Sequence, residues 1–249
     1  MKKIYTLLLP LFAAFVVFSS ASSAQKSAEA EPRLTVIELF TSQGCSSCPP
    51  ADSVLKTMRD RPGILTLSWA VDYWDRLGWE DTFATPYNSM RQTAYNKRFG
   101  LGGVFTPQMV FDGRLECVGS KVDEVRDGLV KARKIKRTHI SPVIKQGTDS
   151  IVVSLPASEK LDMVSIRAVW YQADATVEIG DGENQGRTLH YTNVVRKTEL
   201  LGDWDGTEET RNITIAAPDG ADHIAILLQE EYGHGPIVGA ASLDLNTTE

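Results

Sequence analysis

The chain has 249 residues, with 26 basic and 32 acidic side chains and a formal net charge of −6 at pH 7. Nucleic acid and anionic membrane surfaces attract basic proteins, so this acidic balance argues against both as partners. The three cysteines are too few for a four-thiolate zinc site, and the composition is that of a globular protein with one large or two smaller domains.

The N-terminus is typical of a secretory signal peptide. Met1-Lys2-Lys3 precedes a largely apolar stretch from Ile4 to Phe18, and small residues follow up to Ala24. This predicts a signal peptide at residues 1–24, cleaved after Ala24, and a disordered lead-in at residues 25–33. The apolar stretch is short for a membrane span, although an uncleaved anchor is the alternative. We therefore expect a periplasmic or secreted protein that is free of the membrane after cleavage.

Strands and helices alternate in the first half of the remaining chain. We expect strands at 34–40, 64–71, 108–111 and 115–118, and helices at 49–60, 86–99 and 121–136. Asp112-Gly113 separates the two short strands and is a hairpin signal. This order is that of a thioredoxin fold, so residues 34–138 are predicted to be an α/β thioredoxin-like domain.

Cys45 and Cys48 lie at the turn from the first predicted strand into the first helix. The free N–H groups and positive dipole of a helix start favour a thiolate, so Cys45 is the predicted nucleophile. Cys48 would be the resolving thiol that closes a disulfide. A static disulfide or half of a metal site gives the same spacing. Thiol–disulfide exchange without a cofactor is the preferred interpretation, and it requires a redox partner that resets the cysteines.

Further residues are candidates for the same site. Glu38 is a candidate base for Cys48, or else a structural carboxylate. Thr106-Pro107 precedes the third strand, where thioredoxin-like proteins carry a cis-proline loop that hydrogen-bonds the substrate backbone; an ordinary trans-proline is the alternative. A polar and aromatic run after the second strand predicts either a substrate-docking surface or a packed covering loop, and its candidates are Asp72, Tyr73, Trp74 and Trp79.

From residue 139 onward the sequence predicts strands, at 150–155, 164–171, 176–179, 188–196, 211–216, 223–229 and 237–245. Residues 139–249 are therefore expected to form an all-β sandwich-like domain. One turn and strand is dense in polar side chains, which predicts either a solvated hairpin or a domain interface that latches onto the first domain and restricts access to the cysteines. These interface candidates are Glu183, Asn184, Arg187, His190 and Asn193.

The remaining cysteine and the histidines give weaker signals. Cys117 lies among apolar residues and is expected to be an inert, buried thiol. The four histidines lack ligand spacing, so no metal is assigned. His234 lies in an exposed-looking loop, however, and with the two cysteines it could hold copper. A copper-binding or delivery protein and a binding module with a static disulfide are the alternative functions.

Four strings are long and specific: ELFTSQGCSSCPPAD (Glu38–Asp52), VDYWDRLGWEDTFA (Val71–Ala84), TPQMVFDG (Thr106–Gly113) and GENQGRTLHYTNVVR (Gly182–Arg196). In these strings the chain resembles secreted bacterial thioredoxin-like proteins catalogued as a domain of unknown function. The resemblance covers nearly the whole exported chain and implies a thioredoxin-like fold with an appended β domain. Gly44 replaces the tryptophan of thioredoxin, and Ser46-Ser47 separates the thiols, so the redox direction stays open. We expect an exported thiol–disulfide oxidoreductase acting on a protein or a small thiol.

Overall fold

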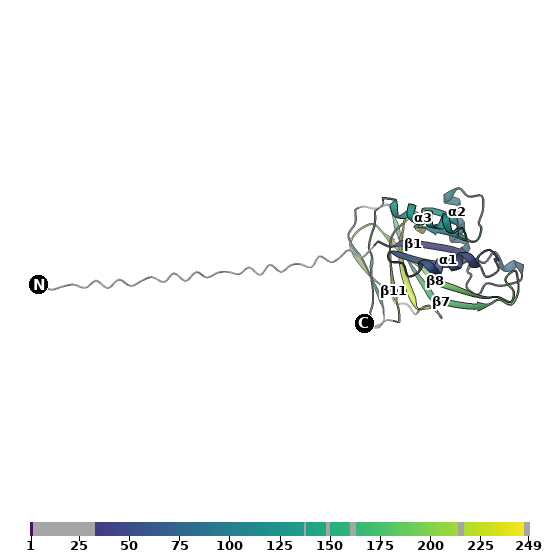
Figure 1. Cartoon of the computed structure of the whole chain (residues 1–249). Helices are drawn as coiled ribbons and strands as arrows, with labels where there is room; N and C mark the ends of the chain where they lie inside the picture. The colour runs from purple at the N-terminus through teal and green to yellow at the C-terminus, as the bar shows by residue number, and fades with distance from the viewer. Residues whose placement is uncertain (2–32, 137, 148–149, 160–162, 214–216, 247–249) are drawn as a thin grey trace. The chain divides into compact units, whose positions relative to one another are not determined.

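Eight strands form one mixed sheet that contains segments from both halves of the chain (Figure 1). Its order is β11-β10-β7-β8-β2-β1-β3-β4. In sequence order these are β1 Thr35–Thr41, β2 Ile64–Ala70, β3 Gln108–Phe111, β4 Leu115–Val118, β7 Val164–Glu178, β8 Thr188–Trp204, β10 His223–Gln229 and β11 Ile237–Asp244. β1 and β2 are parallel and buried along their whole length, which accounts for their nearly continuous apolar sequence.

The structure is a computed structural model that describes residues 1, 33–136, 138–147, 150–159, 163–213 and 217–246. The predicted signal peptide and lead-in lie outside the described residues except for Met1 and Arg33. Within the described ranges, no helix combines the length and the apolar character that crossing a bilayer requires.

Helices cover both faces of the first-half strands. α1 Pro49–Met58 and α3 Val122–Lys134 pack on the face that carries Ile37 and Leu39. α2 Pro86–Phe99 packs on the other face, where Tyr95 lies edge-on to Phe40. The short 3-10 helix η1 Asp75–Leu77 follows β2. Alternating strand side chains point to opposite faces, so neighbouring residues of β1 serve different cores.

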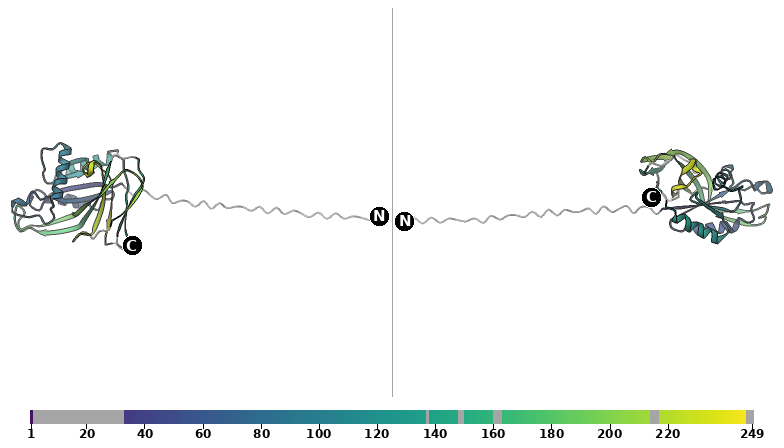
Figure 2. Two further views of the ribbon diagram at one scale, coloured as in Figure 1. Left: turned by 180° about the vertical axis from the view of Figure 1, so that it is seen from behind. Right: turned by 90° about the horizontal axis from the view of Figure 1, so that it is seen from above.

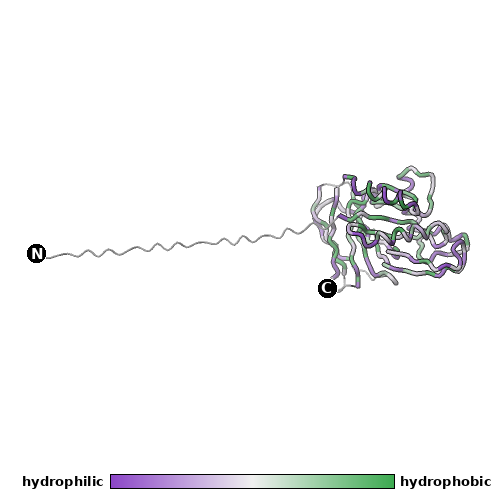
Figure 3. Tube along the Cα trace, viewed as in Figure 1, coloured by the Kyte–Doolittle hydropathy of each residue, from purple (hydrophilic) through white to green (hydrophobic). Residues whose placement is uncertain are grey.

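A second sheet of three strands packs on the second-half strands. β5 Val143–Gln146, β6 Ile151–Leu155 and β9 Glu209–Ile213 form this sheet, and a short irregular helix, α4 Glu230–Gly233, follows β10. Trp170 and Trp204 share an apolar core with Val153 of β6. Figure 3 shows apolar residues along the inner strands and polar residues at the outer turns.

The structure corrects the predicted second half in three ways. The two strands predicted at 164–171 and 176–179 are one strand, β7, because the intervening residues continue to pair with β8. β5 was not predicted, since most of its side chains are exposed and it lacks an apolar pattern. The larger layer of the predicted sandwich is part of the sheet that contains β1 and β2. The fold is therefore a mixed eight-stranded sheet with helices and an additional sheet, and the domain boundary near residue 138 stays a prediction.

A buried ion pair joins the two halves on the α2 face. Arg91 Nε donates to Glu38 Oε1 at 2.7 Å, and both side chains are fully buried. The same guanidinium donates to Gln229 Oε1 and to the carbonyl of Gly233, while the Tyr95 hydroxyl donates to Glu38 Oε2. Burial tends to lower the pKa of Arg91, but the Glu38 carboxylate outweighs it and raises that pKa.

Replacing Arg91 with methionine is expected to lower the free energy of unfolding by about 3–5 kcal/mol, because Glu38 would keep a buried charge without its partner. Arg98→Met, on the same helix but in a partly exposed ion pair, should cost less than about 1 kcal/mol. Urea titrations followed by circular dichroism measure both. Adding Glu38→Gln to Arg91→Met should recover part of the loss, and equal losses for the two arginine variants would contradict the assignment.

Candidate functional site

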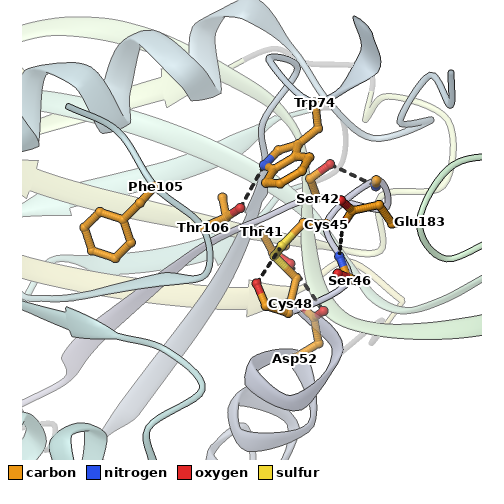
Figure 4. Close-up of a disulfide and its surroundings, with 12 residues drawn as sticks. Thr41, Ser42, Cys45, Ser46, Cys48, Asp52, Trp74, Phe105, Thr106 and Glu183 are labelled. Atoms are coloured by element: carbon orange, nitrogen blue, oxygen red, sulfur yellow. Dashed lines mark hydrogen bonds between the residues drawn. A yellow bond between two sulfur atoms is a disulfide. The ribbon is translucent and has the colours of Figure 1, made fainter. Parts of the chain in front are cut away.

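Cys45 and Cys48 form a disulfide between the end of β1 and the start of α1 (Figure 4). Cys48 is the N-cap of α1, and Pro49 and Pro50 follow at the first helical positions, where a missing N–H costs least. Both cysteines are fully buried, whereas Ser46 and Ser47 between them are exposed. The disulfide therefore lies at a helix start, as the spacing predicts, but its sulfur atoms are covered.

Trp74 forms one wall of the site. Its indole Nε1 donates to Thr106 Oγ1 at 2.8 Å, next to the Thr106–Pro107 peptide bond, which is cis as predicted. Its Cβ also approaches Gly44 so closely that a Cβ at Gly44 would lie 3.2 Å away. A larger residue before Cys45 would therefore require Trp74 to shift by a few tenths of an ångström. Figure 4 shows Trp74 above Cys45.

The other candidates after β2 form hydrogen bonds within the protein. The Tyr73 hydroxyl donates to Gln92 Oε1, and Asp72 accepts from the Ser89 hydroxyl. Trp79 Nε1 donates to Gln43 Oε1 at 2.9 Å, just before the disulfide. The cluster thus holds the loop against α2 and the disulfide turn, and its predicted role in docking a substrate stays a prediction.

The turn between β7 and β8 covers the other side of the disulfide. Glu183 Oε2 accepts the Ser46 N–H at 3.0 Å, and the fully buried Asn184 donates to the carbonyls of Gln43 and Cys45. Arg187 donates to Asn184 Oδ1 at 2.6 Å and so orients the amide. This turn and the loop after β2 lie at the same end of the structure in Figures 1 and 2.

The other two interface candidates have different positions. Asn193 donates to the Thr66 carbonyl and hydroxyl, so it joins β8 to β2 away from the disulfide. His190 is exposed and pairs with Thr176 on β7. The prediction that His190 belongs to the interface is therefore wrong, because its side chain points to solvent.

A buried carboxyl group, Asp52, lies under the disulfide on α1 (Figure 4). Burial raises the pKa of Asp52 to about 8, and the nearby Asp81 raises it further. The hydrogen bond that Thr41 Oγ1 donates to Asp52 Oδ2 acts in the opposite direction and lowers this pKa. Oδ1 has no hydrogen-bond partner. Asp52 is one helical turn after Cys48, so the two side chains share a face of α1.

Asp81 and Tyr191 complete a buried polar cluster around Asp52. Burial raises the pKa of Asp81 to about 6, although the N–H groups of Gln43 and Phe83 bind its carboxylate. The pKa of Tyr191 is raised well above its ordinary value by burial and by both carboxyl groups, and its hydroxyl has no hydrogen-bond partner. Asp52, Asp81 and Tyr191 thus form a buried polar cluster in which burial raises the pKa of each group.

Glu38, the carboxylate predicted to serve Cys48, lies on the opposite face of the sheet. Ile37 and Leu39 face α1, so the alternation of β1 turns Glu38 toward α2, where Arg91 binds it. Its assignment as the base for Cys48 is therefore corrected, and the buried carboxyl group on the α1 face is that of Asp52. The sequence signal that was missed is an aspartate in the apolar stripe of α1, beside Ala51 and Leu55.

Cys117 and His234 both lie apart from the disulfide. Cys117 packs in the core with α3, and burial raises the pKa of its thiol to about 12. The pKa of His234 is lowered by burial and then by Arg91 and Arg167, which places His234 beside the buried ion pair instead of the cysteines. The predicted copper set with His234 is therefore not assembled. Among the described residues, no three His, Cys, Asp or Glu side chains are grouped to hold a metal.

Asp52→Asn is expected to stabilise the oxidised protein at high pH. The wild-type carboxyl has an ordinary pKa of 3.8 when unfolded and about 8 when folded, so folding loses stability as the pH rises through this range. The asparagine variant does not ionise, and the gain above this range is at most about 6 kcal/mol. Urea titrations on both sides of the range measure it, with the exposed Asp60→Asn as control. Identical pH dependence in wild type and Asp52→Asn would contradict the burial of the carboxyl.

Comparison with known proteins places the chain in a family. The crystal structure of protein AGR_C_4864 from Agrobacterium tumefaciens is 31% identical, with a TM-score of 0.76 over 88% of this chain and 98% of that one. HBP35 of Porphyromonas gingivalis, 12% identical, shares the fold with a TM-score of 0.57 over 88% of this chain and 77% of that one. No curated protein matches the sequence. Residues 36–229 match the family described as protein of unknown function (DUF1223), and the chain therefore belongs to that family.

Proposed function

We propose that the protein is a thiol–disulfide oxidoreductase in which Cys45 and Cys48 alternate between disulfide and dithiol. The observation that carries the proposal is a disulfide at a helix N-terminus, beside the Thr106–Pro107 loop and above the buried carboxyl of Asp52. A static disulfide has no need of a carboxyl group whose pKa is near neutrality, and such a group costs stability.

The fold supports a thioredoxin-like identity for residues 34–138. Adjacent strands β2-β1-β3-β4 carry α1 and α3 on one face and α2 on the other, with the cysteines at the end of β1. Thioredoxin-like proteins have this arrangement. In it, Pro107 and Thr106 would position the backbone of a substrate opposite Cys45. We expect the reaction in the periplasm or outside the cell, where the predicted signal peptide would direct the chain.

In the proposed reaction the Cys45 thiolate attacks one sulfur of a substrate disulfide. The substrate S–S bond breaks, a mixed disulfide forms at Cys45, and the other substrate sulfur leaves as a thiolate that takes up a proton. Cys48 then loses its proton, attacks Cys45 Sγ and releases the second substrate thiolate. The protein is oxidised and the substrate reduced by two electrons, and a dithiol redox partner reverses the change.

Asp52 is suited to move the proton of Cys48 in both directions. Its pKa of about 8 leaves both protonation states populated near neutral pH, which is the condition for an efficient acid–base group. Its ionised form accepts the Cys48 proton before Cys48 attacks. Its neutral form returns a proton when Cys48 is the leaving group. Asp81 and Tyr191 extend the buried polar cluster behind it.

A binding module with a static disulfide is the second candidate, and the complete burial of both cysteines favours it. The reduction potential separates the two functions, and it can be measured in glutathione or dithiothreitol buffers with free thiols trapped for mass spectrometry. Exchange predicts a value between about −270 and −120 mV, the range from thioredoxin to strong periplasmic oxidants. Cys117→Ser simplifies the thiol count and should leave the potential unchanged. A value below about −300 mV would support the static disulfide.

Asp52→Asn should slow exchange with a model disulfide by on the order of 100-fold near neutral pH, because Cys48 loses its proton acceptor. It should also remove the part of the rate–pH profile that is centred near pH 8. Asp60→Asn, just beyond the same helix and exposed, should change neither. Stopped-flow kinetics of the resolving step provide the measurement, and an unchanged profile would remove Asp52 from the mechanism.

A further inference from the structure

We propose that the β7–β8 turn, residues 181–186, is a redox-dependent cover that closes over the Cys45–Cys48 disulfide and opens when the disulfide is reduced. The inference rests on the proposed function in one respect, that the disulfide is reduced and re-formed in use. It adds the segment that controls access to Cys45. Asn184 holds this segment closed, and Glu183 makes the closed position depend on the redox state.

Asn184 has the contacts of a latch. Its Nδ2 donates to the carbonyls of Gln43 and Cys45 at 2.9 and 3.0 Å, and its Oδ1 accepts from Arg187. The side chain is fully buried although its neighbours in the turn are largely exposed. All three hydrogen bonds require one orientation of the amide, so the turn is held in a single position on the backbone that carries Cys45.

The Trp79 side chain packs closely against the backbone of the turn and of Gly180 just before it. A Cβ at Gly180 would lie 2.9 Å from Trp79 Cζ3, and a Cβ at Gly182 would lie 3.3 Å from Trp79 Cβ. Trp79 in turn donates to Gln43, the residue that Asn184 also binds. The closed turn, the indole and the disulfide loop therefore form one contact unit. A substrate can reach the buried sulfur of Cys45 only after part of that unit moves.

Glu183 makes the closed position sensitive to the redox state. Its carboxylate accepts the N–H of Ser46, the residue directly after Cys45 and two residues before the helix N-cap Cys48, so a negative charge is held beside Cys45. In the disulfide both sulfur atoms are uncharged, so no conflict arises. Figure 4 shows the hydrogen bond between the Glu183 side chain and Ser46.

Reduction creates a like-charge conflict at this position. A dithiol reductant donates two electrons and is itself oxidised to a disulfide, which leaves a thiolate on Cys45 and a thiol on Cys48. The thiolate then lies one residue away from the backbone group that holds the Glu183 carboxylate, and the two like charges repel each other. This difference in free energy between the two redox states shifts the turn toward the open position.

Two consequences follow for reactivity. In the oxidised protein, a thiol can attack the disulfide only in molecules whose cover is open. The observed rate of attack is therefore lowered in proportion to the open fraction. In the reduced protein, Cys45 is accessible to a substrate disulfide. The cover thus protects the oxidised site from adventitious thiols and exposes the nucleophile when it is able to react.

Two measurements on the full exported chain test the cover. Asn184→Ala should speed reduction of the disulfide by dithiothreitol about tenfold or more, since the loss of one or two ordinary hydrogen bonds has that effect on the open fraction. Gln185→Ala, exposed in the same turn, is the matched control and should react at the wild-type rate. Equal rates for wild type and Asn184→Ala would overturn the latch.

Hydrogen–deuterium exchange on the wild-type protein and on Glu183→Gln tests the redox coupling. Residues 181–187 should exchange faster in the reduced protein than in the oxidised one, and Glu183→Gln should abolish most of that difference. Equal exchange in the two states would overturn the coupling. Both readouts use dithiothreitol alone, so they can succeed even if no substrate forms a mixed disulfide, an outcome that would count against the proposed function only.

Discussion

The pairing of β7 with β8 is the interaction on which the rest of the structure depends. The ladder extends from Val164 opposite Trp204 to Glu178 opposite Thr188, and its three parts have different tasks. The base of the ladder packs on the second sheet, its middle joins β2 through the pair Ser68 and Val194, and its tip covers the disulfide. A shorter hairpin would leave the two sheets in place but expose Cys45. The long ladder therefore connects the second sheet to the turn that covers the disulfide.

The buried carboxyl groups on the two faces of the central sheet differ in their partners. On the α2 face, Glu38 is neutralised by Arg91 and bound by Tyr95, so a charge is retained and serves to join elements. On the α1 face, Asp52 has no basic partner among the described residues, and one of its oxygens forms no hydrogen bond with them. Burial disfavours the ionised form of Asp52 and therefore raises the pKa of this carboxyl group toward neutrality. A group of this kind destabilises the fold, and the proposed exchange reaction at the adjacent disulfide would account for its presence.

The proposed exchange reaction requires access to Cys45, whereas the structure buries both cysteines. Exchange requires that an incoming sulfur atom reach Cys45, yet both cysteines are enclosed by Trp74, by the turn at Glu183 and Asn184, and by the core. The conflict is resolved if the enclosure depends on a few hydrogen bonds at an exposed turn, because such contacts open at a lower free energy than a packed core does. The polar character of the β7–β8 turn, with Gly182 and Gly186 at positive φ, is consistent with that requirement.

The cis bond before Pro107 was expected from the thioredoxin-like order of strands and helices. Local patterns in the sequence determined the first-half strands and helices, the position of the cysteine pair at a helix start and the polar cluster near Asn184. Each of these follows from residues close together in the chain, through side-chain period, capping or turn chemistry. Tertiary structure decided the features that need a partner far along the chain. It joined β8 to β2, turned Glu38 away from the cysteines toward Arg91, buried Asp52 and left His190 in solvent. Which side of a strand faces which core, and whether a carboxyl group meets a base, depends on packing between segments, and no local pattern encodes it.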